Sequence, residues 1–591
     1  MVLGLCLIAL LTYLPTLQHE LVWDDFGVIT HNRSLRSLPL ALRALVAAPA
    51  AGVGEPYDPS VEITRENFRP LRTLAHALVY AVWGAEPAPY HALNLLLHVA
   101  VCFSLFQLLC LLCPGNTLGC FLGTALFALH PVNTEVVCWA KEAEDLLAAL
   151  FVLWTALTWL RLRSDRVDRR GVVVCAVLFL GALLSKESAV FLPVWLGAWL
   201  WLERVSGPAF ASRRGASVEC RVSGKVTAED CPGDQATDAG DLDSPGCARD
   251  MVPNRVEATG VKRNGWGERH GSRGWAVFVT GLLVVVGLAW RHHVLGRTSQ
   301  AGFVTGDCWT TWLSMPRVFL RYLRLEVLPV GLLADYHGFP RAGSMTDAVA
   351  WGYTACFLMV VGLLSWWLWR RRLLAGWLWF WLALAPVMNL IPMLQLGAER
   401  FLYLPTMGIS IILAQSGLGR TRSRTVLAVV TAVLCLLAAL TLDRSRVWRN
   451  ELSLWETTVR QMPRDGRAQR NLAKALLARN RAGEALPILL TLRANIPSAE
   501  HTMLLGYALC GVGRVEEGVP LLCEARAGTV LNDLGAEAAQ RREWTLAERY
   551  FSLALEMDPR DTRYRQNLDL LQREMQAAGV VPLRQKRPAS P

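Results

Sequence analysis

Long apolar segments separated by short polar loops constrain the fold of this chain more than any other feature. The segments cover residues 2–17, 91–112, 117–130, 142–162, 171–184, 188–202, 275–290, 351–369, 373–391, 403–418 and 425–442. A helix needs roughly 20 apolar residues to cross a bilayer, and several segments are somewhat shorter, which leaves their ends poorly defined. Because the chain is 53% hydrophobic and only 18% charged, we predict an all-α, polytopic transmembrane helical bundle of about 11 spans.

Two segments allow more than one interpretation. The stretch at 309–330 is interrupted by a proline and three arginines, so it suits an interfacial helix, a span or part of a re-entrant pair. The segment at 2–17 resembles a signal peptide, but it lacks a basic start and a small-residue cleavage site. We therefore predict that it is an uncleaved first span.

Short arginine-rich loops indicate the orientation of the bundle, because such loops tend to stay in the cytoplasm. The three clusters are Arg161 to Arg170, Arg370 to Arg372 and Arg420 to Arg424. They fall on one side if 309–330 does not cross, which places the N-terminus inside the cytoplasm. The segments predicted to lie outside are 18–70, 131–141, 185–187, 392–402 and everything after residue 442.

Composition divides the chain into a membrane domain at 1–442, a polar periodic domain at 443–580 and a disordered tail at 581–591. Within the first, about 206–273 is rich in Gly, Ser, Asp and Arg, and such a composition buries too little apolar surface to fold. We predict a disordered cytoplasmic insert there. The fifteen cysteines show no metal-ligand spacing and are predicted to be unpaired thiols. The net charge of +11 comes without a nucleic-acid-binding motif, so no nucleic-acid partner is predicted.

The polar C-terminal region has the spacing of tetratricopeptide (TPR) repeats. Pro463 and Pro497 are 34 residues apart, which is the TPR period. The predicted helix pairs cover 467–494, 500–526 and 528–558, with a possible capping helix at 562–578. Three repeats are near the minimum for a stable solenoid. TPR arrays bind extended peptides in a concave groove, so we predict that this region holds a protein acceptor or partner.

Two adjacent carboxylates, Asp24 and Asp25, follow the first apolar segment and lie between Trp23 and Phe26. Charged groups this close to a bilayer are costly unless they are used or paired. They are therefore candidates for chemistry. The alternative is a solvated pair that caps a helix in the loop.

A second polar cluster, HPVNTEVVCWAKEAED, follows the third apolar segment. It carries His130, Glu135, Lys141, Glu142 and Glu144. Its acidic residues also suit the start of a helix, where they favour the helix dipole. His130 ends an apolar segment, and a buried structural histidine is an equally good interpretation.

Two further polar clusters interrupt apolar segments on the same predicted face. One carries Lys186 and Glu187, and the other carries Glu399 and Arg400. A Lys–Glu pair between two helices is also typical of a neutralised turn. An arginine at such a position can bind a phosphate with its fork of donors, or can extend to the lipid headgroups.

Together, the four clusters suggest a narrower chemistry, because the chain has no nucleotide-binding loop. A sugar carried on a polyprenyl or dolichyl phosphate needs a cationic site for the phosphate at membrane depth. It also needs a carboxylate base to deprotonate the incoming hydroxyl. The clusters can provide both.

A series of motifs in fixed order points to a known family. The motifs are WDD, FRPLRTL (68–74), YHALNLLLH (90–98), HPVNTE (130–135), SKE (185–187), AERFLYLP (398–405) and WRNELSLW (448–455). The series resembles the transmembrane and tetratricopeptide repeat-containing (TMTC) family of O-mannosyltransferases and its bacterial TPR relatives, over nearly all the chain except the insert. The resemblance implies a GT-C fold, with the active site on the lumenal or periplasmic face.

The resemblance also implies a reaction. The family transfers mannose from dolichyl-phosphate mannose to Ser or Thr hydroxyls of proteins, in particular cadherin domains, by an inverting displacement. By analogy, Asp24 or Asp25 is the base, and Arg400, with Lys186 or Arg69, binds the donor phosphate. The short TPR array and the long insert depart from the animal members, which puts the acceptor in doubt more than the donor.

By the same analogy, His130, Glu135, Glu187 and Glu399 support the site. No cofactor and no metal ligand are assigned, although relatives of this fold include metal-using enzymes. The expected location is the endoplasmic reticulum membrane in a eukaryote or the inner membrane in a bacterium. Two alternatives remain: transfer of the sugar to a lipid or envelope glycan, and a non-catalytic, membrane-anchored TPR scaffold.

Overall fold

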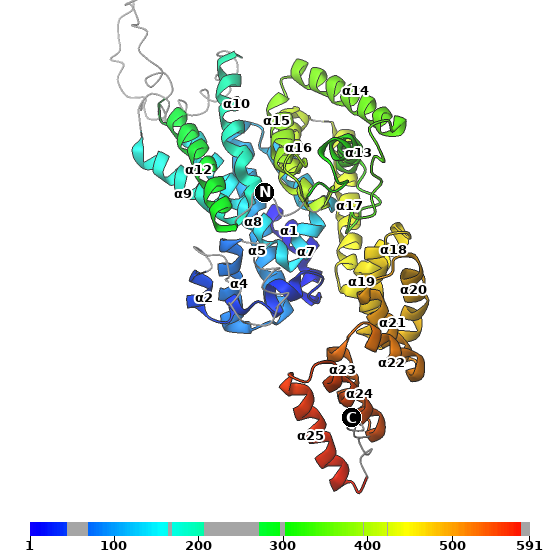
Figure 1. The fold of residues 1–591 in the computed structure, drawn as a ribbon. Helices are drawn as coiled ribbons and strands as arrows, with labels where there is room; N and C mark the ends of the chain where they lie inside the picture. Colours follow the sequence, from blue (N-terminus) through cyan, green and yellow to red (C-terminus); the bar gives the residue numbers. More distant parts are fainter. Residues whose placement is uncertain are drawn as a thin grey trace, which may run out of the picture.

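A computed structural model describes residues 1–43, 69–162, 168–205, 271–295, 302–393, 395–421 and 423–580. Most of the predicted insert at 206–273 and all of the predicted tail at 581–591 lie outside the described residues. Throughout the described ranges the chain forms helices and turns and no strand (Figure 1). This confirms the predicted all-α class.

The helices before residue 448 form the bundle. They are α1 (Val2–Tyr13), α2 (Leu38–Arg43), α4 (Pro70–Trp83), α5 (Pro87–Leu112), α6 (Thr117–Leu129), α7 (Thr134–Cys138), α8 (Ala143–Arg161), α9 (Arg169–Ser185), α10 (Leu192–Val205), α12 (Gly271–Leu295), α13 (Cys308–Val327), α14 (Ala348–Arg370), α15 (Leu374–Leu384), α16 (Tyr403–Gln415) and α17 (Arg424–Val447). Single-turn helices connect several of them, including η1 (Leu14–Gln18), η5 (Ala140–Glu142), η6 (Glu187–Phe191) and η9 (Glu399–Leu402).

Six helical segments among the described residues are long and apolar enough to cross a membrane, which makes this a membrane protein. They are Pro87–Leu112, Ala140–Arg161, Gly271–His293, Ala348–Arg370, Glu399–Arg420 and Arg424–Val447. A seventh is possible if Thr117–Leu129 and Pro131–Cys138, which meet at a bend of 51°, form one broken span. The larger number of about 11 spans stays a prediction.

Burial separates the central helices from those with apolar surfaces facing outward. In the segment Ala140–Arg161, 78% of the apolar stretch is buried, against 17% in Gly271–His293 and none in Ala348–Arg370. Small residues allow close packing at the centre. A Cβ added to Gly376 of α15 would lie 2.5 Å from the carbonyl oxygen of Gly408 in α16. These two helices therefore pack backbone against backbone.

The segment at 309–330 forms one continuous helix, α13, with Pro316 inside it. This helix is not among the six candidate spans. Val318 and Tyr322 are buried, whereas Arg324 is exposed. The three interpretations of this segment stay predictions.

The C-terminal region is a series of helices that projects from the bundle (Figure 1). They are α18 (Glu451–Gln461), α19 (Gly466–Leu477), α20 (Ala482–Asn495), α21 (Ala499–Gly511), α22 (Val515–Glu524), α23 (Gly528–Gln540), α24 (Trp544–Met557) and α25 (Thr562–Ala577). Each helix packs against the next. The pairs α19–α20, α21–α22 and α23–α24 coincide with the three predicted repeats, and their assignment as a TPR solenoid stays a prediction.

The C-terminal array contacts the loop that follows α1. The backbone N–H of Glu20 donates to the carbonyl oxygen of Arg449 at 2.9 Å, and Arg479 pairs with the Glu20 carboxylate at 2.9 Å. Arg467 of α19 also pairs with Asp335, in the segment between α13 and α14, at 3.3 Å. The array therefore lies at the same end of the bundle as Asp24 and Asp25.

Candidate functional site

The loop after α1 and η1 turns sharply at Trp23, whose φ is 56°. A bulky residue with positive φ is uncommon and persists only where its surroundings hold it. The Trp23 ring stacks on Trp139 with centroids 4.9 Å apart and meets Trp455 edge to face at 4.9 Å. Its backbone N–H donates to the carboxylate of Glu451. These contacts fix where the two following carboxylates lie.

Asp25 lies inside the protein, with no exposed surface. Its Oδ2 accepts the backbone N–H of Val22 at 2.9 Å, and its Oδ1 accepts that of Lys141 at 2.8 Å. Burial raises the pKa of Asp25 to about 8, although these two hydrogen bonds act in the opposite direction. The geometry gives Asp25 a structural role, because it ties the first loop to η5.

Asp24 has a more open environment. Its side chain is 33% exposed and accepts from the Lys141 ammonium at 2.8 Å. Burial acts to raise the pKa of Asp24, but the charge of Lys141, helped by Arg400, lowers it below its usual value. Asp24 is therefore ionised at neutral pH, and of the two adjacent acids it is the accessible one.

Trp139 forms a platform beneath the cations next to Asp24. Its ring stacks on Trp448 at 5.4 Å, on the side of the C-terminal array. The Lys141 ammonium lies 4.7 Å and the Arg400 guanidinium 5.6 Å from the Trp139 ring centroid. Such cation–π contacts attract the two like charges to the same ring. Both cations therefore lie against the same ring.

Arg400, at the start of η9, connects this platform to the bundle. Its guanidinium donates to Glu135 at 2.5 Å and to the side-chain oxygen of Gln395 at 2.7 Å, and its backbone N–H donates to Glu135 at 3.0 Å. A weaker pair joins it to Glu142 at 3.6 Å. Arg400, which is predicted to bind the donor phosphate, therefore pairs with Glu135, which is one of the predicted supporting acids.

Lys186, between α9 and η6, is surrounded by acids. Its ammonium pairs with Asp145 at 2.6 Å and with Glu142 and Glu144 at 3.4 Å each. Burial acts to lower the pKa of Lys186, but these carboxylates, Asp145 first, raise it above its usual value. Lys186 therefore stays charged inside the protein.

Arg69 and Arg72, at the start of α4, form the last part of the network. Arg69 pairs with Glu187 at 2.8 Å and with Glu144 at 3.6 Å, and Arg72 pairs with Glu144 at 2.5 Å. Burial acts to raise the pKa of Glu187, but Arg69 and then Arg291 lower it to about 2. Shared carboxylates thus link the cations into one network.

This network pairs opposite charges in a place where isolated charges would be very costly. Two carboxylates of this region are partly exposed, Asp24 beside Lys141 and Glu187 beside Arg69 and Arg291. The neighbouring cations suit an anionic ligand such as a phosphate. In the described ranges of the chain, no group of three or more His, Cys, Asp or Glu side chains is arranged to hold a metal ion.

Two predicted supporting residues lie apart from the network. His130 Nε2 contacts the carbonyl oxygen of Glu326 at 3.3 Å. Glu399 accepts the backbone N–H of Leu333 and pairs with Arg444 at 3.3 Å. His130 therefore contacts α13, and Glu399 connects α17 to the loop between α13 and α14, within electrostatic range of Glu135.

Sequence reasoning did not single out four members or neighbours of the network: Trp139, Arg72, Asp145 and Arg291. A signal existed for Arg72, which is three residues after Arg69 and therefore shares its helix face. Trp139 stands between apolar residues and looks like ordinary core. Arg291 follows an apolar segment, where an arginine normally marks the end of a span.

Comparisons with known proteins place the chain beside one group. Mouse protein O-mannosyl-transferase TMTC1 is 24% identical over 540 residues, covering 80% of this chain and 56% of the relative. Drosophila melanogaster Tmtc1 is 30% identical over 193 residues, covering 32% of this chain and 21% of the relative. The chain is similar to TMTC protein O-mannosyl-transferases.

Human TMTC2 and TMTC3 also match, each at 30% identity, over 27% and 29% of the chain. No protein-family model and no solved structure matches it. The matches to these relatives cover about half of their length in the mouse TMTC1 comparison and about a fifth in the others. These relatives are all named protein O-mannosyl-transferases.

Proposed function

We propose that this chain transfers a sugar, mannose, from a dolichyl- or polyprenyl-phosphate donor to Ser and Thr hydroxyls of proteins. The accessible, ionised carboxylate of Asp24 beside the cationic network is the observation that carries this proposal. The names of the TMTC relatives, which are protein O-mannosyl-transferases, support the sugar and the class of acceptor.

In the proposed step, the acceptor hydroxyl oxygen forms a bond to the anomeric carbon of the sugar. The bond from that carbon to the donor phosphate oxygen breaks, and the phosphate leaves with the bonding electrons. Asp24 takes the hydroxyl proton as general base. Attack opposite the leaving group inverts the configuration at the anomeric carbon. Asp25 positions the loop and does not touch the reacting atoms.

The donor phosphate would lie among Arg400, Lys186 and Arg69. Arg400 lies against the same Trp139 ring as the lysine that pairs with Asp24, and its charge helps to lower the pKa of Asp24. Positive charge aimed at the leaving phosphate stabilises the transition state. The side chains supply this charge, so the proposal assigns no cofactor. Transfer in excess EDTA tests that assignment.

The acceptor protein would be held by the C-terminal array, in the concave groove of a TPR solenoid. The array contacts the same loop that carries Asp24 through the pair of Arg479 with Glu20. The face that carries the loop and the array would be lumenal in the endoplasmic reticulum, or periplasmic in a bacterial inner membrane.

The test is transfer by the purified protein from labelled dolichyl-phosphate mannose to a Ser/Thr-rich protein acceptor. Removing a general base typically lowers a rate by about 10²–10⁴-fold, and we expect a loss in this range for Asp24→Asn. The matched control is Asp443→Asn, because Asp443 is 79% exposed at the end of α17. Transfer by Asp24→Asn at the wild-type rate would remove Asp24 from the mechanism.

A further inference from the structure

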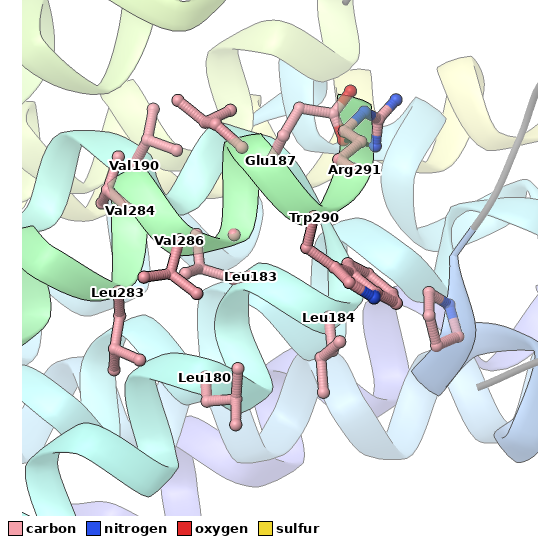
Figure 2. Close-up of a pocket in the computed structure, with 13 residues that line it drawn as sticks. Leu180, Leu183, Leu184, Glu187, Val190, Leu283, Val284, Val286, Trp290 and Arg291 are labelled. Carbon is pink, nitrogen blue, oxygen red and sulfur yellow. Dashed lines mark hydrogen bonds and ion pairs between the residues drawn. The ribbon is translucent and has the colours of Figure 1, made fainter. Parts of the chain in front are cut away.

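A pocket of about 250 Å³ lies between α9 and α12, and its lining includes none of Asp24, Lys141 and Arg400. Figure 2 shows leucine and valine side chains of both helices along its length, among them Leu180, Leu184, Leu283 and Val286. Only 17% of the apolar stretch of α12 is buried. The pocket is therefore bordered by a helix with an outward-facing apolar surface, where lipid chains would lie.

One end of this pocket is charged. Glu187 and Arg291 lie together there, beside Trp290 (Figure 2). Arg291 pairs with one Glu187 oxygen at 3.3 Å, and Arg69 pairs with the other at 2.8 Å. Glu187 thus bridges two guanidinium groups, and its side chain is 39% exposed.

We propose that this pocket binds the isoprenoid chain of a polyprenyl phosphate, and that Arg69 and Arg291 bind its phosphate when Glu187 moves away. The inference rests on the proposed function for the identity of the lipid. The shape and charge of the pocket agree with this occupant. Its apolar lining suits an uncharged chain, and the two guanidinium groups at its end suit a phosphate, which Arg binds through paired hydrogen bonds.

Glu187 would hold the place of the phosphate in the empty protein. A carboxylate between two arginines neutralises them, and a phosphate offers more oxygens and more negative charge for the same donors. From Arg69, the network continues through Glu144 and Lys186. The charged end of the pocket is therefore connected to the cations that would hold the donor during transfer.

The first test fills the pocket. A Cβ added to Gly287 in α12 meets the Leu183 side chain at 3.5 Å, an ordinary contact, whereas Gly281 in the same helix has no atom within 4 Å. Gly287→Leu therefore places a side chain inside the pocket, and Gly281→Leu is the matched control outside it. Binding of a photoactivatable polyprenyl phosphate without sugar would be measured by crosslinking. We expect Gly287→Leu to lose at least about tenfold in affinity and Gly281→Leu to match the wild type.

The second test asks whether Glu187 occupies the position of the phosphate in the empty protein or instead supports the structure of the site. Arg291→Gln removes one charged partner of the phosphate and should weaken binding by about tenfold or more. Glu187→Gln removes the competing carboxylate and should strengthen binding. Weaker binding by Glu187→Gln, unchanged binding by Gly287→Leu, or equal competition by phosphatidic acid would each overturn the inference.

Sugar transfer measured in parallel keeps the two proposals distinct. If transfer depends on Asp24 while the pocket variants bind and crosslink as the wild type does, the pocket assignment fails and the proposed function stands. If the wild-type protein binds polyprenyl phosphate in the pocket but transfers no sugar, the proposed function fails instead.

Discussion

Replacing Asp25 by Asn tests whether this carboxyl group is structural and neutral. Both of its oxygens accept a backbone N–H, from Val22 and from Lys141. Asn has one acceptor oxygen, so one of these buried N–H groups loses its partner. An unsatisfied buried donor costs about 1–3 kcal/mol. We expect Asp25→Asn to lower the free energy of unfolding by this amount at about pH 4 or below, where the carboxyl group is protonated in both the folded and the unfolded chain.

The pH dependence gives the sharper test. The pKa of Asp25 is raised to about 8 in the folded protein, against about 3.9 in an unfolded chain. Below the lower value both states are protonated at this position, and the contribution of Asp25 to stability is at its maximum. Between the two values only the unfolded chain has released the proton, so stability falls as pH rises and levels off above the folded pKa. At about 1.4 kcal/mol for each unit, the loss is on the order of 5 kcal/mol.

The Asn variant has no proton to release at this position, so it lacks this loss. Its disadvantage of about 1–3 kcal/mol should therefore shrink as pH rises and reverse at about pH 5–6, where the wild type has lost the same amount, and the variant should be the more stable protein well before the folded pKa of about 8. The assay is thermal unfolding of the detergent-purified proteins across this range, with Asp24→Asn as control. Breaking the partly exposed pair of Asp24 with Lys141 should cost about 1 kcal/mol or less. A difference for Asp25→Asn that stays constant or grows with pH would show that the carboxyl group is ionised in the folded state.

Three further predictions concern packing. Trp139→Ala should lower the free energy of unfolding by about 3–5 kcal/mol, because the ring is buried, and a melting temperature equal to the wild type would contradict this. Arg467→Ala removes an ion pair and a contact over the Trp23 ring, so limited proteolysis should cut the C-terminal array faster, and unchanged cleavage would argue against this anchor. Gly376→Ala forces a Cβ against the Gly408 carbonyl, so the yield of folded protein should fall, whereas Gly362→Ala, which meets no atom within 4 Å, should express normally.

Much of the fold follows from local sequence patterns. The apolar segment at 91–112 lies within α5, and the segment at 425–442 lies within α17. The pairs of amphipathic helices after Pro463 also occur as predicted. Hydropathy and periodicity act within one helix, so they can be read without knowing what the helix contacts. The number of spans is less accessible, because short apolar helices can be buried by protein as well as by lipid.

The candidate site was accessible only in part. Asp24 and Asp25 are adjacent and share the same sequence context. The left-handed turn at Trp23 leaves the Asp24 side chain 33% exposed and Asp25 fully buried. Similarly, Glu399 and Arg400 are neighbours, but one faces Arg444 and the other belongs to the network. A change of one residue in a short helix turns the side chain to another partner.

The sequence by itself determined that this protein is a helical membrane protein with a periodic polar array at its end, because burial of apolar surface depends on composition and spacing. Only the tertiary structure decided which charges meet. The pair of Arg400 with Glu135 joins residues 265 positions apart, and the pair of Arg291 with Glu187 joins residues 104 positions apart. No local pattern encodes such pairs, since an arginine at the end of a helix has the same neighbours in sequence whether it binds a carboxylate, a phosphate or the membrane surface.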